Sequence, residues 1–440
     1  MNITVAGTGY VGLVTGVSLA EIGHRVVCFD IDKEKVMTLM KGKSPIYEPG
    51  LEEMIIKNQT NERLTFSFEP NIAYSNPDII IIAVGTPGNS DGSADLSYVK
   101  KVAKDISKYL KKDKVTVVTK STVSIGTNHK IKLWIEEDAN ADLKVDIVSN
   151  PEFLREGTAI YDTFNGDRIV IGSENESAAK LLEDVYRPFN LPFVHTDIES
   201  AEMIKYASNA FLATKISFIN EIANLCEKIG ANIEDVSKAV GMDRRIGSDF
   251  LQAGLGYGGS CFPKDTNALV QLAGHVQHSF NLLESVIEVN NKQPFLLLQK
   301  ARGIVGSSFK DKKVAVLGIA FKPNTDDIRE AASLILIKEL IKDKAIVNVF
   351  DPIARHNVEK VFGDLVNYNE TIEETIKDTE LVFIATEWTQ IKTFTISKYK
   401  ELMKTPNVVD GRNCYSLQDM KKLDITYASV GRKTIIRENV

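Results

Sequence analysis

Short apolar segments alternate with longer amphipathic segments along the first 150 residues of the chain. Strands are predicted at residues 3–6, 25–30, 79–84, 115–119 and 145–148. Between them, the segments 96–110 and 128–137 place their apolar residues at helical spacing. This alternation predicts an α/β fold in which a doubly wound parallel sheet carries helices on both faces.

The middle of the chain is predicted to be helical. Residues 200–230 contain no proline, and their first glycine is Gly230, so they predict one long helix after an acidic turn at Asp197 and Glu199. Further helices are predicted at 233–240, 265–272 and 280–303. We expect the long helix to connect two domains and to offer a surface for a dimer.

The last third of the chain partly repeats the first. A new strand is predicted at 313–318, Val349-Phe350-Asp351 resembles Cys28-Phe29-Asp30, and 381–386 resembles 80–85. These similarities predict a second Rossmann-like domain. Two doubly wound parallel-sheet domains joined by the long central helix are therefore expected, with boundaries at 1–196, 197–305 and 306–440.

Composition and charge narrow the function classes. A chain of 440 residues is too long for one core, and a net charge of −6 without a stripe of basic residues excludes a nucleic-acid surface. The longest apolar run, 79–84, is too short to cross a membrane. The four cysteines are scattered, the histidines lack metal-ligand spacing, and no signal segment precedes the first strand. We expect a cytoplasmic protein without a bound metal.

A dinucleotide-binding fingerprint follows the first strand. Gly7 permits a tight turn, Gly9 lets a pyrophosphate approach the backbone, and Gly12 lets helix and strand pack closely. The helix N-terminus offers N–H groups to phosphates. Asp30 closes the second strand, where a carboxylate accepts hydrogen bonds from a ribose diol and repels a 2′-phosphate, so NAD is predicted over NADP. The corresponding turn of the second domain, 318–322, lacks these glycines and is expected to hold something other than a dinucleotide.

Cys261 lies in the run Gly-Gly-Ser-Cys-Phe-Pro-Lys-Asp at 258–265. It is either a packed cysteine in a glycine-rich turn or a nucleophile, with Lys264 and Asp265 close enough to tune a thiolate. A thiol together with a nicotinamide suggests oxidation through a covalent thioester. Ser121 and Thr122 follow a strand, where such residues are either helix caps or ligand contacts.

Taken in order, the motifs of this chain resemble the UDP-glucose/GDP-mannose dehydrogenase family over essentially the whole length. The motifs are 7–12 with Asp30, 47–51, 84–87, 91–96, 120–123, 150–157, 202–206 with Asn209, 258–265, and 321–327 with Arg329 and Glu330. The resemblance implies oxidation of the C6 alcohol of UDP-glucose to UDP-glucuronate in two successive NAD-dependent hydride transfers. Cys261 would trap the aldehyde as a thiohemiacetal, and water would hydrolyse the thioester formed next.

The resemblance also implies roles for individual residues. Lys205 and Asn209 would stabilise oxyanions, Asp265 would work with Lys205 in proton handling, and Thr122 and Glu152 would position a water molecule. The implied catalytic set is Cys261, Lys205, Asp265, Asn209, Thr122 and Glu152. Implied cofactor contacts are Gly7, Gly9, Tyr10, Val11, Gly12, Asp30, Lys35, Thr86, Ser121, Thr122, Glu156, Cys261, Lys264 and Arg329. Implied substrate contacts are Glu152, Phe153, Leu154, Lys205, Asn209, Arg245, Phe250, Leu251, Tyr257, Gly258, Cys261, Phe321, Lys322 and Arg412.

Two alternatives remain open from the sequence. A sister enzyme acting on GDP-mannose or an N-acetylated UDP-sugar would share the sulfur, lysine and aspartate. An NAD-dependent sensor or scaffold would keep the fold and lose the chemistry, but Cys261, Lys205 and Asp265 are all present. The resemblance favours UDP-glucose and a homodimer through the central helical domain, with Arg245 contributed across the subunit interface.

Overall fold

The computed structural model describes residues 1–89, 92–139 and 143–437, which form two compact units. The first unit comprises 1–208 with 267–276, and the second comprises 209–266 with 277–440. Their boundaries fall inside two helices, α9 (Ile198–Ile229) and α11 (Phe262–His275). Asp91, part of the 91–96 motif, lies outside the described residues. Within the described ranges, no helix is both long and apolar enough to span a bilayer.

The first unit is built on an eight-stranded sheet of order β3-β2-β1-β4-β5-β6-β7-β8. Its strands are β1 (Asn2–Ala6), β2 (Arg25–Phe29), β3 (Leu64–Ser67), β4 (Ile79–Ile82), β5 (Lys114–Thr119), β6 (Lys144–Ser149), β7 (Ile169–Ser173) and β8 (Phe193–Thr196). All neighbours are parallel except β6 and β7. The five predicted strands are confirmed. The sequence pattern did not indicate β3, β7 and β8, which extend the sheet at its two ends.

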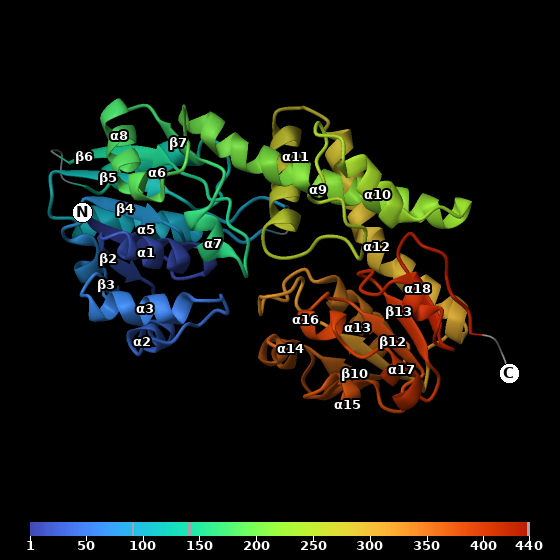
Figure 1. Cartoon of the computed structure of the whole chain (residues 1–440). Helices are drawn as coiled ribbons and strands as arrows, with labels where there is room; N and C mark the ends of the chain where they lie inside the picture. The colour runs from blue at the N-terminus through green and yellow to red at the C-terminus, as the bar shows by residue number, and fades with distance from the viewer. Residues whose placement is uncertain (90–91, 140–142, 438–440) are drawn as a thin grey trace. The chain divides into compact units, whose positions relative to one another are not determined.

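Both faces of this sheet are covered by helices, as predicted (Figure 1). In β4, Ile79 and Ile81 pack into one apolar core while Ile80 and Ile82 pack into another, which explains the uninterrupted run of isoleucine. The first core includes side chains of α1 (Tyr10–Glu21), α2 (Lys33–Met40), α3 (Leu51–Thr60), α7 (Ala159–Phe164) and α8 (Glu176–Tyr186). The second includes those of α4 (Pro70–Tyr74), α5 (Ser97–Tyr109) and α6 (Thr127–Glu136).

The predicted helices of the middle segment are confirmed. The 32 residues of α9 form one unbroken helix, and α10 (Ile233–Gly241), α11 and α12 (Asn281–Val305) cover the other predicted ranges. Because α11 begins at Phe262, three residues earlier than predicted, Cys261 lies directly at its N-terminus.

The second unit contains a six-stranded sheet that is parallel throughout, of order β11-β10-β9-β12-β13-β14. The strands are β9 (Lys313–Leu317), β10 (Ile346–Phe350), β11 (Asn367–Tyr368), β12 (Leu381–Ile384), β13 (Asn407–Asp410) and β14 (Thr426–Ser429). Its helices are α13 (Ala332–Lys342), α14 (Arg355–Phe362), α15 (Ile372–Ile376), α16 (Thr389–Lys392), α17 (Ser397–Leu402) and α18 (Leu417–Met420). The predicted second Rossmann-like domain is therefore confirmed.

Candidate active site

The glycine-rich turn after β1 has the geometry that a dinucleotide needs. Gly7 has a φ of +101°, which favours glycine, and a Cβ added at Gly12 would lie 2.1 Å from the Gly7 carbonyl oxygen. A Cβ added at Gly9 would meet no atom within 4 Å. Tyr10 and Val11 begin α1, whose first-turn N–H groups face the same region. The open space at Gly9 and this helix N-terminus therefore fit a diphosphate.

Asp30, directly after β2, is held in place beside this turn. Its Oδ2 accepts hydrogen bonds from the Thr8 backbone N–H at 2.9 Å and hydroxyl at 2.6 Å, and Lys35 Nζ lies 3.4 Å away. Burial acts to raise the pKa of Asp30, but the bonds from Thr8 and Asp32 and the charge of Lys35 outweigh it, so the pKa is lowered. The carboxylate is ionised and oriented, which suits an acceptor for ribose hydroxyls.

The hydroxyl residues after β4 and β5 tie these two strand ends together. Thr86 Oγ1 donates to the Thr122 carbonyl oxygen at 2.8 Å, and Ser121 Oγ donates to the Val84 carbonyl oxygen at 2.7 Å. Helix α6 has Gly126 as its N-cap, so neither Ser121 nor Thr122 caps it. Through these hydrogen bonds, Ser121 and Thr122 instead connect the segments that follow β4 and β5 at the carboxyl edge of the sheet.

A buried ion pair lies in the first unit. Lys205 Nζ on α9 is 2.8 Å from Glu152 Oε1, and each side chain is 4% exposed. The Leu154 backbone N–H donates to Glu152 Oε2 at 2.7 Å. Burial acts to raise the pKa of Glu152, but the charge and hydrogen bond of Lys205 outweigh it and lower the pKa. The Phe153 ring lies 3.7 Å from the Arg168 guanidinium and 5.6 Å from Lys205 Nζ.

Two residues near this pair were not assigned a role from the sequence. Lys120 is buried at the end of β5 and donates through Nζ to Asn150 Oδ1 at 2.9 Å. Burial lowers the pKa of Lys120 to about 8, an effect that nearby Glu152 opposes and Lys205 reinforces. An isolated lysine in a sequence is usually a solvated charge, but its place directly after a buried strand was a usable signal.

Glu48 is a third residue to which the sequence analysis assigned no role. Its buried carboxylate accepts hydrogen bonds from the backbone N–H groups of Gly157 and Ala159, each at 2.7 Å. Glu48 therefore anchors the loop that carries Glu156, one of the predicted cofactor contacts. The sequence analysis included Glu48 in the 47–51 motif but did not predict this anchoring role.

In the second unit, Cys261 occupies the N-terminus of α11. The Asp265 backbone N–H donates to the Cys261 carbonyl oxygen at 2.8 Å, and Ser260 Oγ lies 3.7 Å from the Cys261 sulfur. The thiol is partly exposed. A helix N-terminus stabilises negative charge, so this position favours a thiolate.

Asp265 is buried one turn into α11 and links two predicted residues. Its Oδ2 accepts from Asn209 Nδ2 at 2.7 Å, and its Oδ1 lies 2.9 Å from Lys264 Nζ. Asn209 and Asp265 are far apart in the chain, and the fold brings them together. Lys264 was predicted to contact the cofactor, and here it pairs with Asp265.

The predicted substrate-binding residues of the second unit gather around the 258–259 turn. A Cβ at Gly258 would lie 2.3 Å from the Glu330 carbonyl oxygen, and one at Gly259 would lie 2.8 Å from the Phe321 ring. Arg412 donates to the carbonyl oxygens of Ala385 at 2.9 Å and Phe321 at 3.1 Å. Only glycine fits this close packing at 258 and 259, and the hydrogen bond from Arg412 ties its side chain to the backbone of Phe321.

The remaining predicted contacts of this unit have separate surroundings. Tyr257 packs edge-on against Phe262, with ring centroids 5.8 Å apart, Leu251 is buried, and Phe250 adopts a φ of +64°. Lys322 Nζ lies 5.4 Å from the Phe321 ring centroid. Two predicted arginines form local pairs: Arg329 with Asp327 at 2.7 Å and Arg245 with Asp243 at 2.6 Å.

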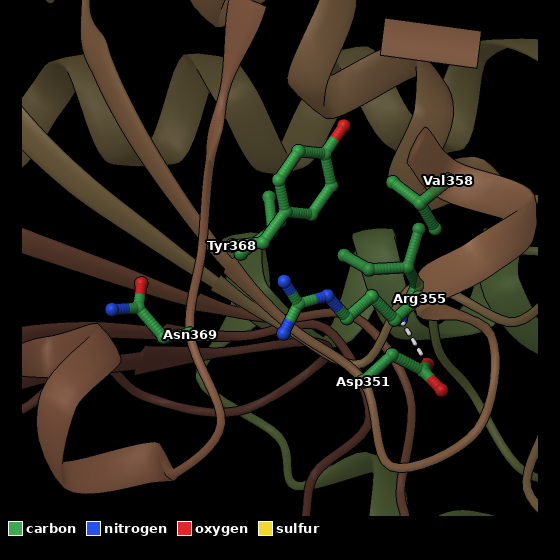
Figure 2. A pocket seen from close by; sticks show the side chains of 7 residues that line it. Asp351, Arg355, Val358, Tyr368 and Asn369 are labelled. Carbon is green, nitrogen blue, oxygen red and sulfur yellow. Dashed lines mark hydrogen bonds between the residues drawn. The ribbon is translucent and has the colours of Figure 1, made fainter. Parts of the chain in front are cut away.

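The second sheet has different surroundings at the place equivalent to Asp30. Asp351 follows β10, but its carboxylate accepts from the backbone N–H groups of Ile319 and Ala320 and from the Trp388 indole. The Arg355 side chain extends into the space beneath the Tyr368 ring (Figure 2). The cavity that remains measures about 10 Å³, room for about one water molecule.

Gly9 and Gly12 of the first turn make a matched test of dinucleotide binding. We expect Gly9→Val to fold normally and to weaken NAD⁺ binding more than about tenfold, because its side chain fills the space for the diphosphate. Gly12→Ala should instead destabilise the fold by about 1–3 kcal/mol, because its Cβ meets backbone. Calorimetric titration and thermal melts of both variants check this. Wild-type affinity in Gly9→Val would contradict the assignment.

Comparison with known proteins identifies the family. Three domain models of the UDP-glucose/GDP-mannose dehydrogenase family match the chain: the NAD binding domain at 1–190, the central domain at 199–292 and the UDP binding domain at 315–417. The UDP-glucose 6-dehydrogenase YwqF of Bacillus subtilis is 56% identical over 438 residues, covering 99% of each chain.

Solved structures agree with this match. A UDP-glucose dehydrogenase from Pyrobaculum islandicum superposes with a TM-score of 0.91 at 39% identity, covering 98% of each chain. A UDP-D-ManNAc dehydrogenase from Pyrococcus horikoshii gives a TM-score of 0.87 at 25% identity, covering 98% of this chain and 99% of its own. With the glycine-rich turn, the buried carboxylate–lysine pair and the helix-capping cysteine all in place, the chain belongs to the UDP-glucose/GDP-mannose dehydrogenase family.

Proposed function

We propose that this protein oxidises the C6 alcohol of UDP-glucose to the carboxylate of UDP-glucuronate, using NAD⁺ as the oxidant. The observation that carries the proposal is the position of Cys261, a partly exposed thiol at the N-terminus of α11. The 56% identity with a UDP-glucose 6-dehydrogenase over nearly the whole chain supports the choice of substrate.

Cys261 is the nucleophile of the second oxidation step. Its sulfur adds to the aldehyde carbon, and the carbonyl oxygen takes up a proton to give a thiohemiacetal. Loss of a hydride from that carbon and of the hydroxyl proton gives a thioester, which water cleaves to the carboxylate and the free thiol. The helix N-terminus favours the attacking thiolate and its release at the end of the cycle.

Lys205 and Asn209 stabilise the oxyanions of these steps. They lie one turn apart on α9, so both side chains point from one face of the helix. An ammonium and an amide N–H₂ are suitable donors to a developing negative charge. Asp265 holds Asn209 in place through the 2.7 Å hydrogen bond and serves, with Lys205, in proton handling.

Glu152 and Thr122 act on water in the hydrolysis step. The low pKa of Glu152 keeps its carboxylate ionised and able to accept a proton from water. Thr122 follows β5 at the same carboxyl edge of the sheet as Glu152 follows β6. We assign Thr122 the orientation of that water.

The cofactor site is proposed on the turn 7–12 and Asp30, with Lys35, Thr86, Ser121, Glu156, Lys264 and Arg329 as further contacts. When bound, NAD⁺ accepts the hydrides released at C6. The ionised Asp30 accepts hydrogen bonds from ribose hydroxyls and repels a 2′-phosphate, which supports NAD over NADP.

The substrate is proposed to bind through Arg412, Lys322 and Phe321 of the second unit, with the 250–258 loop enclosing the nucleotide. The two cationic side chains suit a diphosphate. Glu152, Phe153, Leu154, Lys205 and Asn209 are assigned to the sugar. The four cysteines, all within the described residues, form no disulfide bond, which supports a cytoplasmic enzyme.

The exposed face of α9 supports a homodimer, to which Arg245 would contribute across the interface. Phe211, Phe218 and Leu225 are spaced seven residues apart and are 66%, 54% and 52% exposed. Residues at this spacing lie on one side of a helix, and exposed aromatic residues are enriched at interfaces.

Reaction stoichiometry tests the proposed activity. With limiting UDP-glucose and excess NAD⁺, we expect two NADH per UDP-glucose, measured by absorbance, with UDP-glucuronate identified by mass spectrometry. The same assay with GDP-mannose and N-acetylated UDP-sugars should give far slower NADH formation. One NADH per sugar with release of the aldehyde would exclude the thioester route, and a faster reaction of another sugar would reassign the substrate.

The covalent role of Cys261 is tested by Cys261→Ser. We expect NADH formation to fall at least about a thousandfold, because an alkoxide is much harder to generate than a thiolate. Steady-state assays and intact-protein mass spectrometry measure the loss and any trapped ester. Cys414→Ser is the matched control and should keep wild-type turnover. Full turnover in Cys261→Ser would make Cys261 structural.

Oligomeric state is tested by light scattering. We expect a particle of about twice 48.7 kDa, and a shift toward the monomer in Phe218→Glu because a charge is buried at the interface. Leu365→Glu alters another exposed apolar residue, outside α9, and should leave the mass unchanged. A monomeric wild type would contradict the homodimer.

A further inference from the structure

We propose that Lys120 is a positioning residue whose ammonium group keeps the buried Glu152–Lys205 pair in a net positive environment. The inference rests on the proposed function, because it concerns the oxyanions formed in that reaction. Lys120 was assigned no role above, although it is a buried titratable group at the carboxyl end of β5.

The direct partners of Lys120 are uncharged. Its Nζ donates to the amide oxygen of Asn150 at 2.9 Å and lies 5.4 Å from the centroid of the Tyr186 ring. Asn150 in turn donates through Nδ2 to the Val170 carbonyl oxygen at 2.7 Å. This chain of bonds fixes the ammonium between the ends of β5, β6 and β7.

The charged groups around Lys120 do not balance. Glu152 and Lys205 are the ionisable side chains that interact with it electrostatically. The Glu152 carboxylate is already occupied, by Lys205 Nζ at 2.8 Å and by the Leu154 N–H at 2.7 Å. Of the three buried side chains Lys120, Glu152 and Lys205, two carry a positive charge and one carries a negative charge, so the three together carry a net positive charge.

Such an arrangement works against stability. An ammonium group removed from water and faced by neutral partners destabilises the folded state, and a second ammonium nearby adds repulsion. A methionine or glutamine would fit a buried site of this size at less cost. The retained charge therefore points to a use in the reaction.

The role of the Lys120 charge in the reaction follows from the charge balance at Lys205. Glu152 cancels much of the positive charge that Lys205 could offer to an oxyanion. Lys120 restores a positive potential at the same carboxyl edge of the sheet, without contacting the substrate. When the alcohol loses its proton or a tetrahedral oxyanion forms, the cluster becomes neutral instead of negative, a form of preorganised electrostatic stabilisation.

The test is Lys120→Gln, which keeps a hydrogen-bond donor for Asn150 and removes the charge. We expect kcat for UDP-glucose oxidation to fall about tenfold to a hundredfold, with KM for NAD⁺ unchanged and the melting temperature unchanged or raised. Lys114→Met is the matched control: Lys114 opens the same strand, pairs with Asp146 at the surface, and should behave as wild type.

The pH profile supplies a readout that a structural role would not change. Burial places the pKa of Lys120 at about 8, so its ammonium is progressively lost as the pH rises through that value. Glu152 and Lys205 face the same cluster and are unaltered in the variant. We expect wild-type kcat to decrease above about pH 8, and this decrease to be absent in Lys120→Gln.

Three outcomes would overturn the inference. These are wild-type kcat in Lys120→Gln, an unchanged alkaline decrease in that variant, or a melting temperature lowered by more than about 5 °C, which marks a structural role. The proposed function fails separately, if wild-type protein forms no NADH from UDP-glucose. In that case the comparison of wild type with Lys120→Gln is made on the nucleotide sugar that the protein does oxidise.

Discussion

Parallel strand pairing is the constraint on which both units depend. In the first sheet it directs the carboxyl ends of β1, β4, β5 and β6 to one edge, and both faces are sealed by apolar helices. Burying a charge in such an interior is costly, so the charged side chains of the site lie where the strands end. The glycine turn, Ser121, Lys120 and Glu152 all follow a strand at that edge.

Burying charged side chains at this edge costs folding free energy, so each buried charge needs a partner. Glu152 and Lys205 are almost fully buried, and a buried ion pair adds little net stability compared with apolar packing. Breaking it by removing one partner leaves the other charge unpaired. In the second unit the buried carboxylate of Asp265 is likewise held by two partners, the Lys264 ammonium and the Asn209 amide. Pairs of this kind are best explained by the chemistry that they serve.

The two sheets show how one topology can carry different sites. Asp30 and Asp351 occupy equivalent positions after the second strand of each Rossmann-like sheet. Around Asp30 lie a glycine turn and open space, whereas Asp351 is surrounded by backbone N–H groups and an indole, with Arg355 and Tyr368 closing the cavity. The fold supplies an edge, and the side chains that fill it decide what can bind.

Local patterns in the sequence determined much of this protein. The buried strands follow from short apolar runs, and the long helix follows from a segment without proline or internal glycine. Gly7, Gly12 and Asp30 follow from the dinucleotide-binding motif. The motif order was specific enough to indicate the family. The sequence pattern did not reveal β3, β7 and β8, which add to the two ends of the sheet order and make fewer contacts with both cores than the central strand β4.

Only the tertiary structure decided which charged residues meet. The pairing of Glu152 with Lys205, and of Asn209 with Asp265, joins segments separated by whole helices and strands. The position of Lys120 after a buried strand hinted at burial, but its hydrogen bond to Asn150 is formed only in the folded sheet. Burial and charge pairing depend on long-range packing, and no short window of sequence contains them. The sequence therefore determined which residue types are available to the site, while the tertiary structure decided which of them are buried and in contact.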